Sequence, residues 1–142
     1  MSRGARKVNN VLRTDKMNVF SLFRMYTSDK LYVNRRYQRK LVWGVEEQRL
    51  LVDSILKEIP LPSVFLINCE YEDSKYNHFE IVDGMQRIFA IVSFLLGDFA
   101  VEYEGDMCYF DPMQDAVTAR LLQEGKIKER DTYLPSEVVF GQ

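Results

Sequence analysis

The sequence predicts a mixed α+β domain. Three observations support this prediction: a strand that runs directly into an apolar helix near residue 84, an amphipathic helix before it, and short β-favouring segments separated by turn residues. The chain has 142 residues, of which 46% are apolar, and such a chain can bury one hydrophobic core. We therefore expect a flexible basic arm over residues 1–16 and a single domain over residues 17–142.

The first half of the chain alternates helical and extended patterns. Residues 17–25 carry apolar side chains at helical and at alternating positions, and we expect a short helix there, followed by a short strand over residues 31–33. Residues 45–58 form the clearest helix, with acids in the first turn and an apolar stripe along one face. A strongly apolar strand over residues 63–69 is expected to be central in the sheet, and residues 76–82 return antiparallel to it.

The second half begins with a helix over residues 88–96 that is apolar almost all round and is ended by a glycine. Residues 99–103 and 107–110 predict a hairpin around a polar turn, and residues 112–124 predict a further helix. Residues 131–140 are apolar enough to pack, although the chain ends two residues later. We expect either that these residues need a partner or that the chain is the N-terminal part of a longer protein.

The predicted strand and the apolar helix meet at the sequence Asp83-Gly84-Met85-Gln86-Arg87. A strand that enters a helix through Asp-Gly brings the N–H groups of the first turn to one point, where the unpaired donors and the helix dipole attract anions. Gly84 lets the backbone approach a ligand closely. Arg87 lies in the first turn, where the dipole disfavours a cation, and phosphate binding would explain its position. Asp83 is the candidate ligand for a divalent cation or a water molecule, and Gln86 is the candidate residue to position either.

A structural interpretation of the same five residues stands beside the functional one. In it, Asp83 is only the N-terminal cap of the helix and Arg87 is a solvated surface charge. A string of this length arises often by chance, so its spacing alone leaves both interpretations open.

A second candidate region is the basic segment, residues 35–43, with the sequence Arg-Arg-Tyr-Gln-Arg-Lys-Leu-Val-Trp. Four cations surround a tyrosine and a tryptophan ends the segment, a composition that suits phosphate pairing and base stacking. In the alternative, the aromatic side chains anchor the core and the cations lie at its rim. We expect Trp43 to belong mainly to the core and Arg39 to be functional.

The composition excludes several classes of protein and site. No run of about 18 apolar residues is present, so no membrane span is predicted, and no apolar region of a signal peptide follows the basic start. Cys69 and Cys108 are too few for a disulfide framework and lack metal-ligand spacing, which favours the cytoplasm as location. His78 is the only histidine, so the chain holds no multi-histidine zinc centre and no HNH nuclease centre. The net charge of −2 gives no overall attraction to nucleic acid, although the first third of the chain is basic.

Four groups of residues follow one another in a specific order: Arg36-Tyr37-Gln38-Arg39 with Trp43, Ile59-Pro60-Leu61-Pro62 before Phe65-Leu66, Ile81-Val82-Asp83-Gly84-Met85-Gln86-Arg87, and Phe94-Leu95-Leu96-Gly97-Asp98-Phe99. In this order they resemble the N-terminal domain of GmrSD-type modification-dependent restriction proteins, which belongs to the ParB/sulfiredoxin-like group. The resemblance covers residues 31–110, more than half of the chain. The combination is specific, whereas any one of the motifs alone is not.

The resemblance implies a small mixed sheet with flanking helices. It also implies that the domain binds and often hydrolyses a nucleoside triphosphate with Mg²⁺, and couples this to sensing modified phage DNA. Carried over by position, the catalytic candidates are Asp83, Gln86 and Arg87, and Asp83 is also the metal ligand. The nucleotide-binding candidates are Gly84, Met85, Arg87, Arg39, Gln38, Tyr37 and Arg36, with Trp43 as the candidate for base stacking.

Two departures from the family pattern change what is expected. Met85 replaces the first glutamine of the usual pair and removes an amide that could hold water or phosphate, so binding is favoured over hydrolysis. No cysteine lies between Gly84 and Arg87, which excludes the sulfinate repair of the sulfiredoxin relatives.

The sequence thus predicts a nucleotide-binding domain with weak hydrolysis at most, acting in a restriction system against phage. Cutting of DNA is expected only from a nuclease domain or subunit supplied elsewhere. The alternative is a regulatory module that binds DNA or a partner protein, or that forms an oligomer, without catalysis. DNA binding through many cations would weaken steeply as salt rises.

Overall fold

A computed structural model describes residues 7–13, 19–28, 31–33, 43–58, 65–71 and 78–138. The chain divides into two compact units: unit 1 comprises Met1–Val42 and Pro62–Met85, and unit 2 comprises Trp43–Leu61 and Gln86–Gln142. Helices and strands both occur, which confirms the predicted α+β class. The single domain expected over residues 17–142 stays a prediction.

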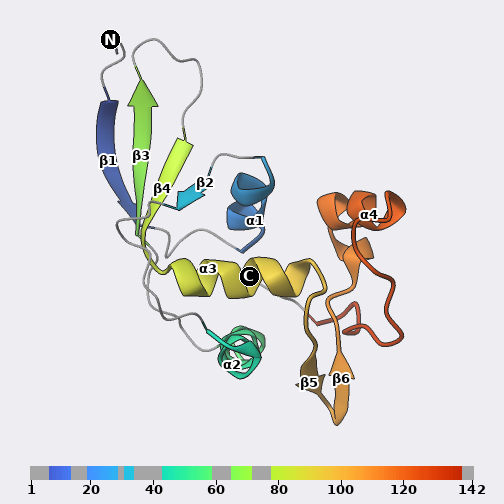
Figure 1. Ribbon diagram of the computed structural model, residues 1–142. Helices are drawn as coiled ribbons and strands as arrows, with labels where there is room; N and C mark the ends of the chain where they lie inside the picture. Colours follow the sequence, from blue (N-terminus) through green and yellow to red (C-terminus); the bar gives the residue numbers. More distant parts are fainter. Residues whose placement is uncertain are drawn as a thin grey trace. The chain divides into compact units, whose positions relative to one another are not determined.

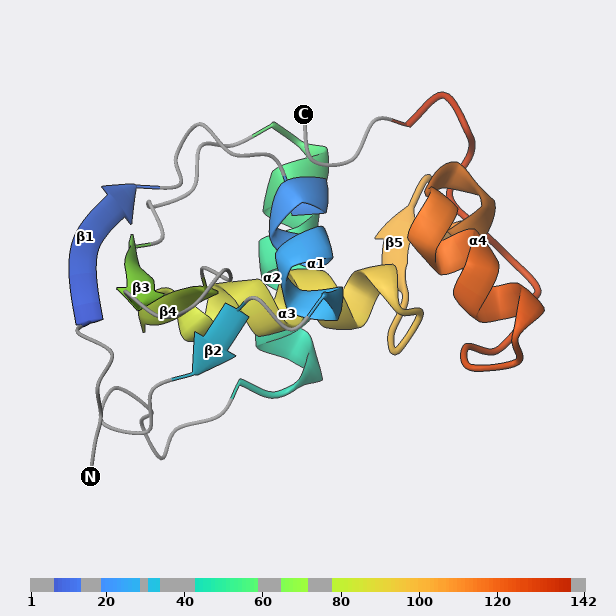
Figure 2. The ribbon, with the colours of Figure 1, turned by 90° about the horizontal axis from the view of Figure 1, so that it is seen from above.

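Unit 1 is built on a four-stranded sheet (Figures 1 and 2). The order along the sheet is β1 (Lys7–Arg13), β3 (Phe65–Tyr71), β4 (His78–Asp83) and β2 (Leu31–Val33). β3 pairs antiparallel with both of its neighbours, whereas β2 pairs parallel with β4, so the sheet is mixed as expected. β3 is an inner strand, as its apolar sequence predicts.

Strand β1 is where the structure differs from the expected flexible arm over residues 1–16. Lys7–Arg13 pairs with β3 along its whole length, from Lys7 opposite Tyr71 to Arg13 opposite Phe65. Its valines and leucine favour extended backbone, and without it β3 would present an edge of unpaired N–H and C=O groups. The basic, asparagine-containing composition does not reveal this pairing, because the partner strand lies far away in the sequence. Residues 1–6 and 14–16 lie outside the described part of the chain.

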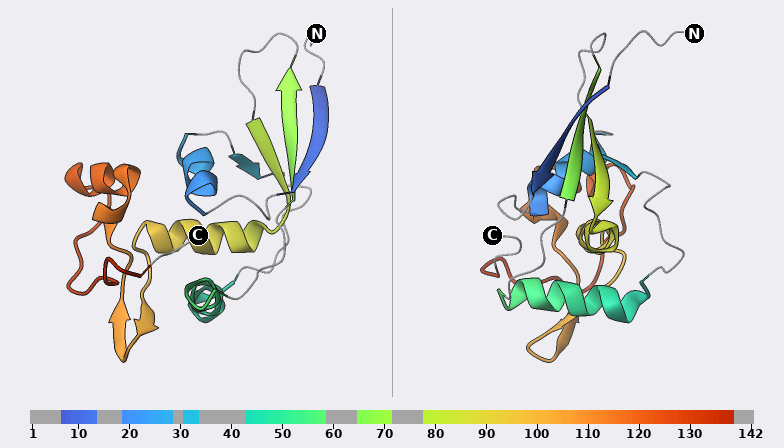
Figure 3. Two further views of the ribbon diagram at one scale, coloured as in Figure 1. Left: turned by 180° about the vertical axis from the view of Figure 1, so that it is seen from behind. Right: turned by 90° about the vertical axis from the view of Figure 1, so that its left-hand side faces the viewer.

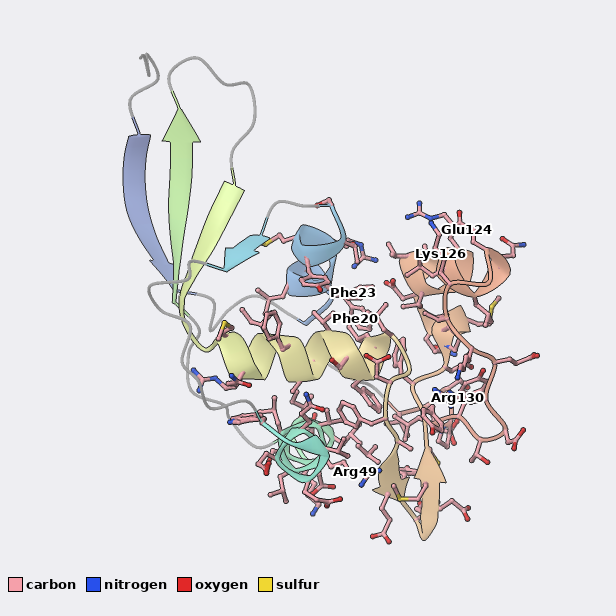
Figure 4. The ribbon with its side chains drawn as sticks, in the orientation of Figure 1. Phe20, Phe23, Arg49, Glu124, Lys126 and Arg130 are labelled. Atoms are coloured by element: carbon pink, nitrogen blue, oxygen red, sulfur yellow. The ribbon has the colours of Figure 1, made fainter. Side chains whose placement is uncertain are left out.

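Helix α1 (Val19–Thr27) confirms the short helix expected in unit 1. Leu22 and Phe23 are buried while Arg24 is exposed, which is the amphipathic pattern of a helix that covers a core. The helix ends at Thr27, and the hydroxyl of the next residue, Ser28, donates to the carbonyl oxygen of Arg24 at 2.7 Å. Figure 4 labels Phe20 and Phe23 on this helix.

Two helices that cross at a steep angle form the centre of unit 2 (Figures 1 and 3). α2 (Val45–Leu56) begins at Gly44, whose N–H donates to Glu47 Oε1 at 2.8 Å, and it buries Leu51 and Val52. The sequence of α3 (Met85–Leu95) is apolar almost all round, which allows most of the helix to be buried. The buried residues are Ile88, Ala90, Ile91, Val92, Phe94 and Leu95. The backbone leaves α3 through Gly97, whose φ of +81° is in the left-handed region that favours glycine.

The predicted hairpin follows α3. β5 (Val101–Tyr103) pairs antiparallel with β6 (Asp106–Cys108), with Tyr103 opposite Asp106. The turn has two residues and not the expected three, since Asp106 belongs to the strand. Glu104 and Gly105 have φ values of 50° and 88°, and positive φ at both positions is what a type I′ hairpin turn requires.

The helix expected over residues 112–124 is two elements, a 3₁₀ turn η2 (Pro112–Gln114) and α4 (Ala116–Gln123). The break lies at Asp115, whose carboxylate accepts the N–H of Val117 at 3.1 Å and so caps α4. Thr118 joins the two elements, because its hydroxyl contacts the carbonyl oxygens of Pro112 at 2.6 Å and Asp115 at 3.0 Å. Thr118 is fully buried.

Replacing Thr118 by valine is expected to lower the free energy of unfolding by about 1–3 kcal/mol, because the carbonyl of Pro112 then loses its short bond from the buried hydroxyl and keeps only the 3.4 Å bond from the N–H of Asp115. Urea denaturation measures the change. Thr132→Val is the matched control, since Thr132 is exposed and should shift the midpoint little. Equal shifts for the two variants would contradict the importance of this hydrogen bond.

Part of the apolar C-terminal stretch packs within unit 2. The N–H of Tyr109 donates to the carbonyl of Thr132 at 3.0 Å, and the N–H of Leu134 donates to the carbonyl of Tyr109 at 2.8 Å. Leu134 is buried as a result. Residues 139–142 lie outside the described part. Among the described helices, none has the length and apolar character needed to cross a membrane.

Candidate functional site

The candidate site is the corner where β4 ends and α3 begins. β4 ends at Asp83, α3 begins at Met85, and Gly84 between them has a φ of 93°. This φ lies in the left-handed region, where a side chain would strain the backbone, so the need for glycine is conformational. The local structure is the strand-to-helix turn that the sequence predicts. Asp83 to Arg87 are consecutive, so their backbones lie within a few residue lengths of one another.

The first turn of α3 contains Gln86 and Arg87 and no acidic residue. This composition differs from that of α2, whose first turn contains Glu46 and Glu47. Arg87 is half-buried and its Nε atom is buried, so the guanidinium is held against the protein and does not extend freely into solvent. A cation and helix N–H donors close together favour an anion as ligand.

A hydrogen bond joins Gln86 to the end of the basic segment. The backbone N–H of Trp43 donates to Gln86 Oε1 at 3.1 Å, across 43 positions of the sequence. Both side chains are half-buried. The structure therefore brings together one residue from each of the two regions that the sequence singles out. Sequence reasoning missed this bond, because a backbone donor has no signature in residue identities.

The other candidates of the basic segment, Arg36, Tyr37, Gln38 and Arg39, lie outside the described residues. For Asp83 the structure describes the backbone at the end of β4. Met85 is half-buried at the first position of α3. The predicted functions of all these residues stay predictions.

The start of α2, next to Trp43, is fixed within unit 2 by Arg49 (Figure 4). Arg49 Nε donates to the carbonyl oxygen of Ala100 at 2.9 Å, and its Nη1 contacts Glu46 Oε1 at 2.6 Å. α2 is thereby tied to the segment that follows α3. Trp43 and Gln86 consequently belong to one set of packed elements.

A groove of about 370 Å³ lies elsewhere in unit 2, lined by Met107, Tyr109, Glu129, Arg130, Asp131 and Thr132. Arg130 lies over the ring of Tyr109, 4.4 Å from its centroid, and its Nη2 donates to the carbonyl oxygen of Gly97 at 3.0 Å. Figure 4 labels this arginine. None of the residues that the sequence singles out as functional lines this groove, and no motif in the sequence indicates it.

Within the described residues, no three histidine, cysteine or acidic side chains come together as a metal site would require. Cys108 is buried and forms no disulfide, and burial raises the pKa of its thiol, which opposes the reactive thiolate form.

The comparisons with known proteins bear on the same residues. The model of the family described as GmrSD restriction endonuclease, N-terminal domain, matches residues 19–138. This match covers far more than half of the 142 residues and includes Trp43, the β4–α3 corner and the hairpin. No curated protein and no solved structure matches the chain. The chain belongs to the family of GmrSD restriction endonuclease N-terminal domains.

Proposed function

We propose that the chain binds a nucleoside triphosphate together with Mg²⁺ at the β4–α3 corner and hydrolyses it weakly, as the nucleotide-binding component of a restriction system. The observation that carries the proposal is the 3.1 Å hydrogen bond from Trp43 N to Gln86 Oε1, because it brings the end of the basic segment to the first turn of α3.

The first turn of α3 supplies the chemistry for the phosphates. Its N–H groups and the positive end of the helix dipole favour negative charge. Arg87 in the same turn adds a planar guanidinium, which can pair with two phosphate oxygens at once. Gly84 allows the backbone to come close to the ligand, since no Cβ intervenes.

The basic segment can supply further cations to the same phosphates. Arg39 precedes Trp43 by four residues, so its Cα lies within about 15 Å of the Trp43 Cα whatever the conformation between them. An arginine side chain covers part of that distance. In this proposal Arg39 and Arg36 assist Arg87, and Tyr37, Gln38 and Trp43 contact the rest of the nucleotide.

The donor set fits a metal that arrives with the nucleotide. Mg²⁺ in such sites is held by one or two carboxylates, by phosphate oxygens and by water, so a cluster of three protein ligands is not needed. Asp83, the last residue of β4, would supply one carboxylate. When bound, Mg²⁺ would neutralise charge on the phosphates. Asp83 would hold the ion or align water beside it.

A second function, of a different class, is favoured by the basic residues in the first third of the chain. The cations of the basic segment and of the first residues could bind DNA phosphates without catalysis, with the β4–α3 corner as a purely structural turn. In place of DNA, such a regulatory module would bind a partner protein or a second copy of the chain.

Calorimetric titration with ATP, GTP and CTP in the presence of Mg²⁺ tests the proposal. We expect saturable binding whose affinity changes less than about tenfold between about 50 and about 200 mM salt, because few counterions are released from a pocket-bound nucleotide. The same measurement with duplex DNA provides the comparison. Absence of binding to every nucleotide, together with DNA binding that falls about a thousandfold over this salt range, would establish the second function instead.

A further inference from the structure

We propose that the groove beside β6 is a docking site for an extended segment of a partner protein that carries an arginine or lysine side chain. The groove has a volume of about 370 Å³ and is lined by Met107, Tyr109 and residues 129–132, all of which belong to unit 2. The proposal does not depend on the nucleotide site, because no residue of the β4–α3 corner lines this groove.

The hydrogen bonding of β6 directs the backbone of Met107 toward the outer edge of the hairpin. In a hairpin with a two-residue turn, Tyr103 and Asp106 form the first hydrogen-bonded pair, and such pairs alternate with non-hydrogen-bonded pairs along the strands. Val101 and Cys108 form the next hydrogen-bonded pair, so the N–H and C=O of Met107 point away from β5. They are therefore available to a further strand.

The C-terminal segment pairs with this same edge at Tyr109, whose N–H donates to the carbonyl of Thr132 and whose carbonyl accepts the N–H of Leu134. Continuation of this parallel ladder would join Met107 to the carbonyl of Arg130 and to the N–H of Thr132. Neither bond forms between these described residues. The groove lies at this opening of the ladder, where backbone donors and acceptors can pair with an extended chain.

Arg130 fixes the segment on the other side of the groove relative to Tyr109 (Figure 4). Its guanidinium lies 4.4 Å from the centroid of the Tyr109 ring, and its Nη2 donates to the carbonyl oxygen of Gly97 at 3.0 Å. Its backbone N–H donates to the hydroxyl oxygen of Tyr133 at 2.8 Å. A groove that is held in shape before binding loses less conformational entropy when a segment binds.

The charges of the lining determine which side chain the segment carries. Glu129 and Asp131 are exposed, and neither forms an ion pair with another residue in the described part of the chain. Arg130 is the one cation among the lining residues, so two carboxylates face one guanidinium. A cation of the partner would pair with these carboxylates, whereas the phosphates of a nucleic acid would be repelled by them.

Nuclear magnetic resonance titration of the 142-residue chain with a capped peptide tests the proposal. The peptide alternates valine and threonine, which favour extended backbone, around one central arginine. We expect saturable shifts of the amide signals of Met107 and Thr132, because both N–H groups lie at the opening of the ladder. Hydrogen exchange at Met107 should slow when the peptide binds, while the amide of Cys108, which is already paired with β5, should change little.

Two comparisons test the role of the charges. A peptide with glutamine in place of the arginine should bind about 3- to 10-fold more weakly, because two exposed ion pairs are lost. For the double variant Glu129→Gln, Asp131→Asn, the Kd values of the two peptides should differ by less than about twofold. The matched control is Asp98→Asn, Glu137→Gln, which neutralises two exposed carboxylates outside the lining and should keep the preference for the arginine peptide.

Each of three results would overturn the proposal. The first is the absence of saturable shifts at the groove with the arginine peptide. The second is equal affinity of the wild type for the arginine and glutamine peptides, or a preference for arginine that survives in the variant of Glu129 and Asp131. The third is a shift of the same amides by single-stranded oligothymidine and not by the peptide, which would assign the groove to nucleic acid. These samples contain no nucleoside triphosphate, so failure here and failure of the proposed function are distinguishable.

Discussion

Replacing Arg87 by alanine is expected to raise the Kd for Mg–nucleotide by about 100-fold or more. A guanidinium that pairs with phosphate makes charge-assisted hydrogen bonds, each with a net value of about 1.5–3 kcal/mol, and 1.4 kcal/mol corresponds to tenfold in affinity. Two such bonds are lost together. Arg87→Lys keeps the charge but not the planar pair of donors, so we expect an intermediate Kd. Calorimetric titration measures all three proteins.

The control for Arg87 must separate a lost ligand contact from a damaged fold. Arg87 Nε is buried, so its removal also alters packing around the first turn of α3. Arg120→Ala removes a cation from the exposed side of α4, far along the sequence from the corner, and should leave Kd and melting temperature unchanged. If Arg87→Ala loses its cooperative melting transition, or if Arg120→Ala weakens nucleotide binding as much, the assignment of Arg87 to the phosphate site is wrong.

Elements determined by local pattern could be predicted from the sequence. The strand expected over residues 31–33 is β2 with the same bounds, and the amphipathic pattern of residues 45–58 corresponds to α2 (Val45–Leu56). The apolar run before Gly97 corresponds to α3, in which six of the eleven residues are buried and the others are half-buried. In each case the residues that set the backbone conformation are neighbours in sequence, so propensity and burial agree.

Features that depend on distant partners could not be predicted. β1 pairs with a strand more than fifty positions away, and neither strand indicates the register. The break at Asp115 was missed for a different reason, because its partner, the N–H of Val117, is local: the sequence pattern leaves open whether an aspartate caps a helix or lies in its interior. At the candidate site the strand–glycine–helix corner could be predicted, whereas the contact between Trp43 and Gln86 could not, since it joins positions 43 residues apart.

Replacing Phe94 by alanine is expected to have the largest effect on stability, a decrease of about 3–5 kcal/mol in the free energy of unfolding. Phe94 is fully buried in α3, and its ring centroid lies 5.6 Å from that of Phe99 and 6.1 Å from that of Phe110. The variant loses the buried surface, leaves a cavity and removes two aromatic contacts. Domains are stable by only about 5–15 kcal/mol, so the melting temperature should fall by about 10 °C or more.

The position of Phe94 also tests whether stability and binding are separable in α3. Phe94 follows Arg87 by seven residues, about 10 Å along the helix axis, so it stabilises the helix without reaching the first turn. Below its melting temperature, Phe94→Ala should therefore bind Mg–nucleotide with the wild-type Kd.

Phe94→Leu, which retains most of the buried volume, should lose less stability, and Met113→Ala should lose almost none because Met113 is 68% exposed. A Phe94→Ala protein that is as stable as Met113→Ala would show that the aromatic cluster is not the core of unit 2. A folded Phe94→Ala protein with strongly weakened binding would mean that the first turn of α3 depends on the packing at the opposite end of the helix. The effect of Arg87→Ala could then no longer be assigned to a phosphate contact alone.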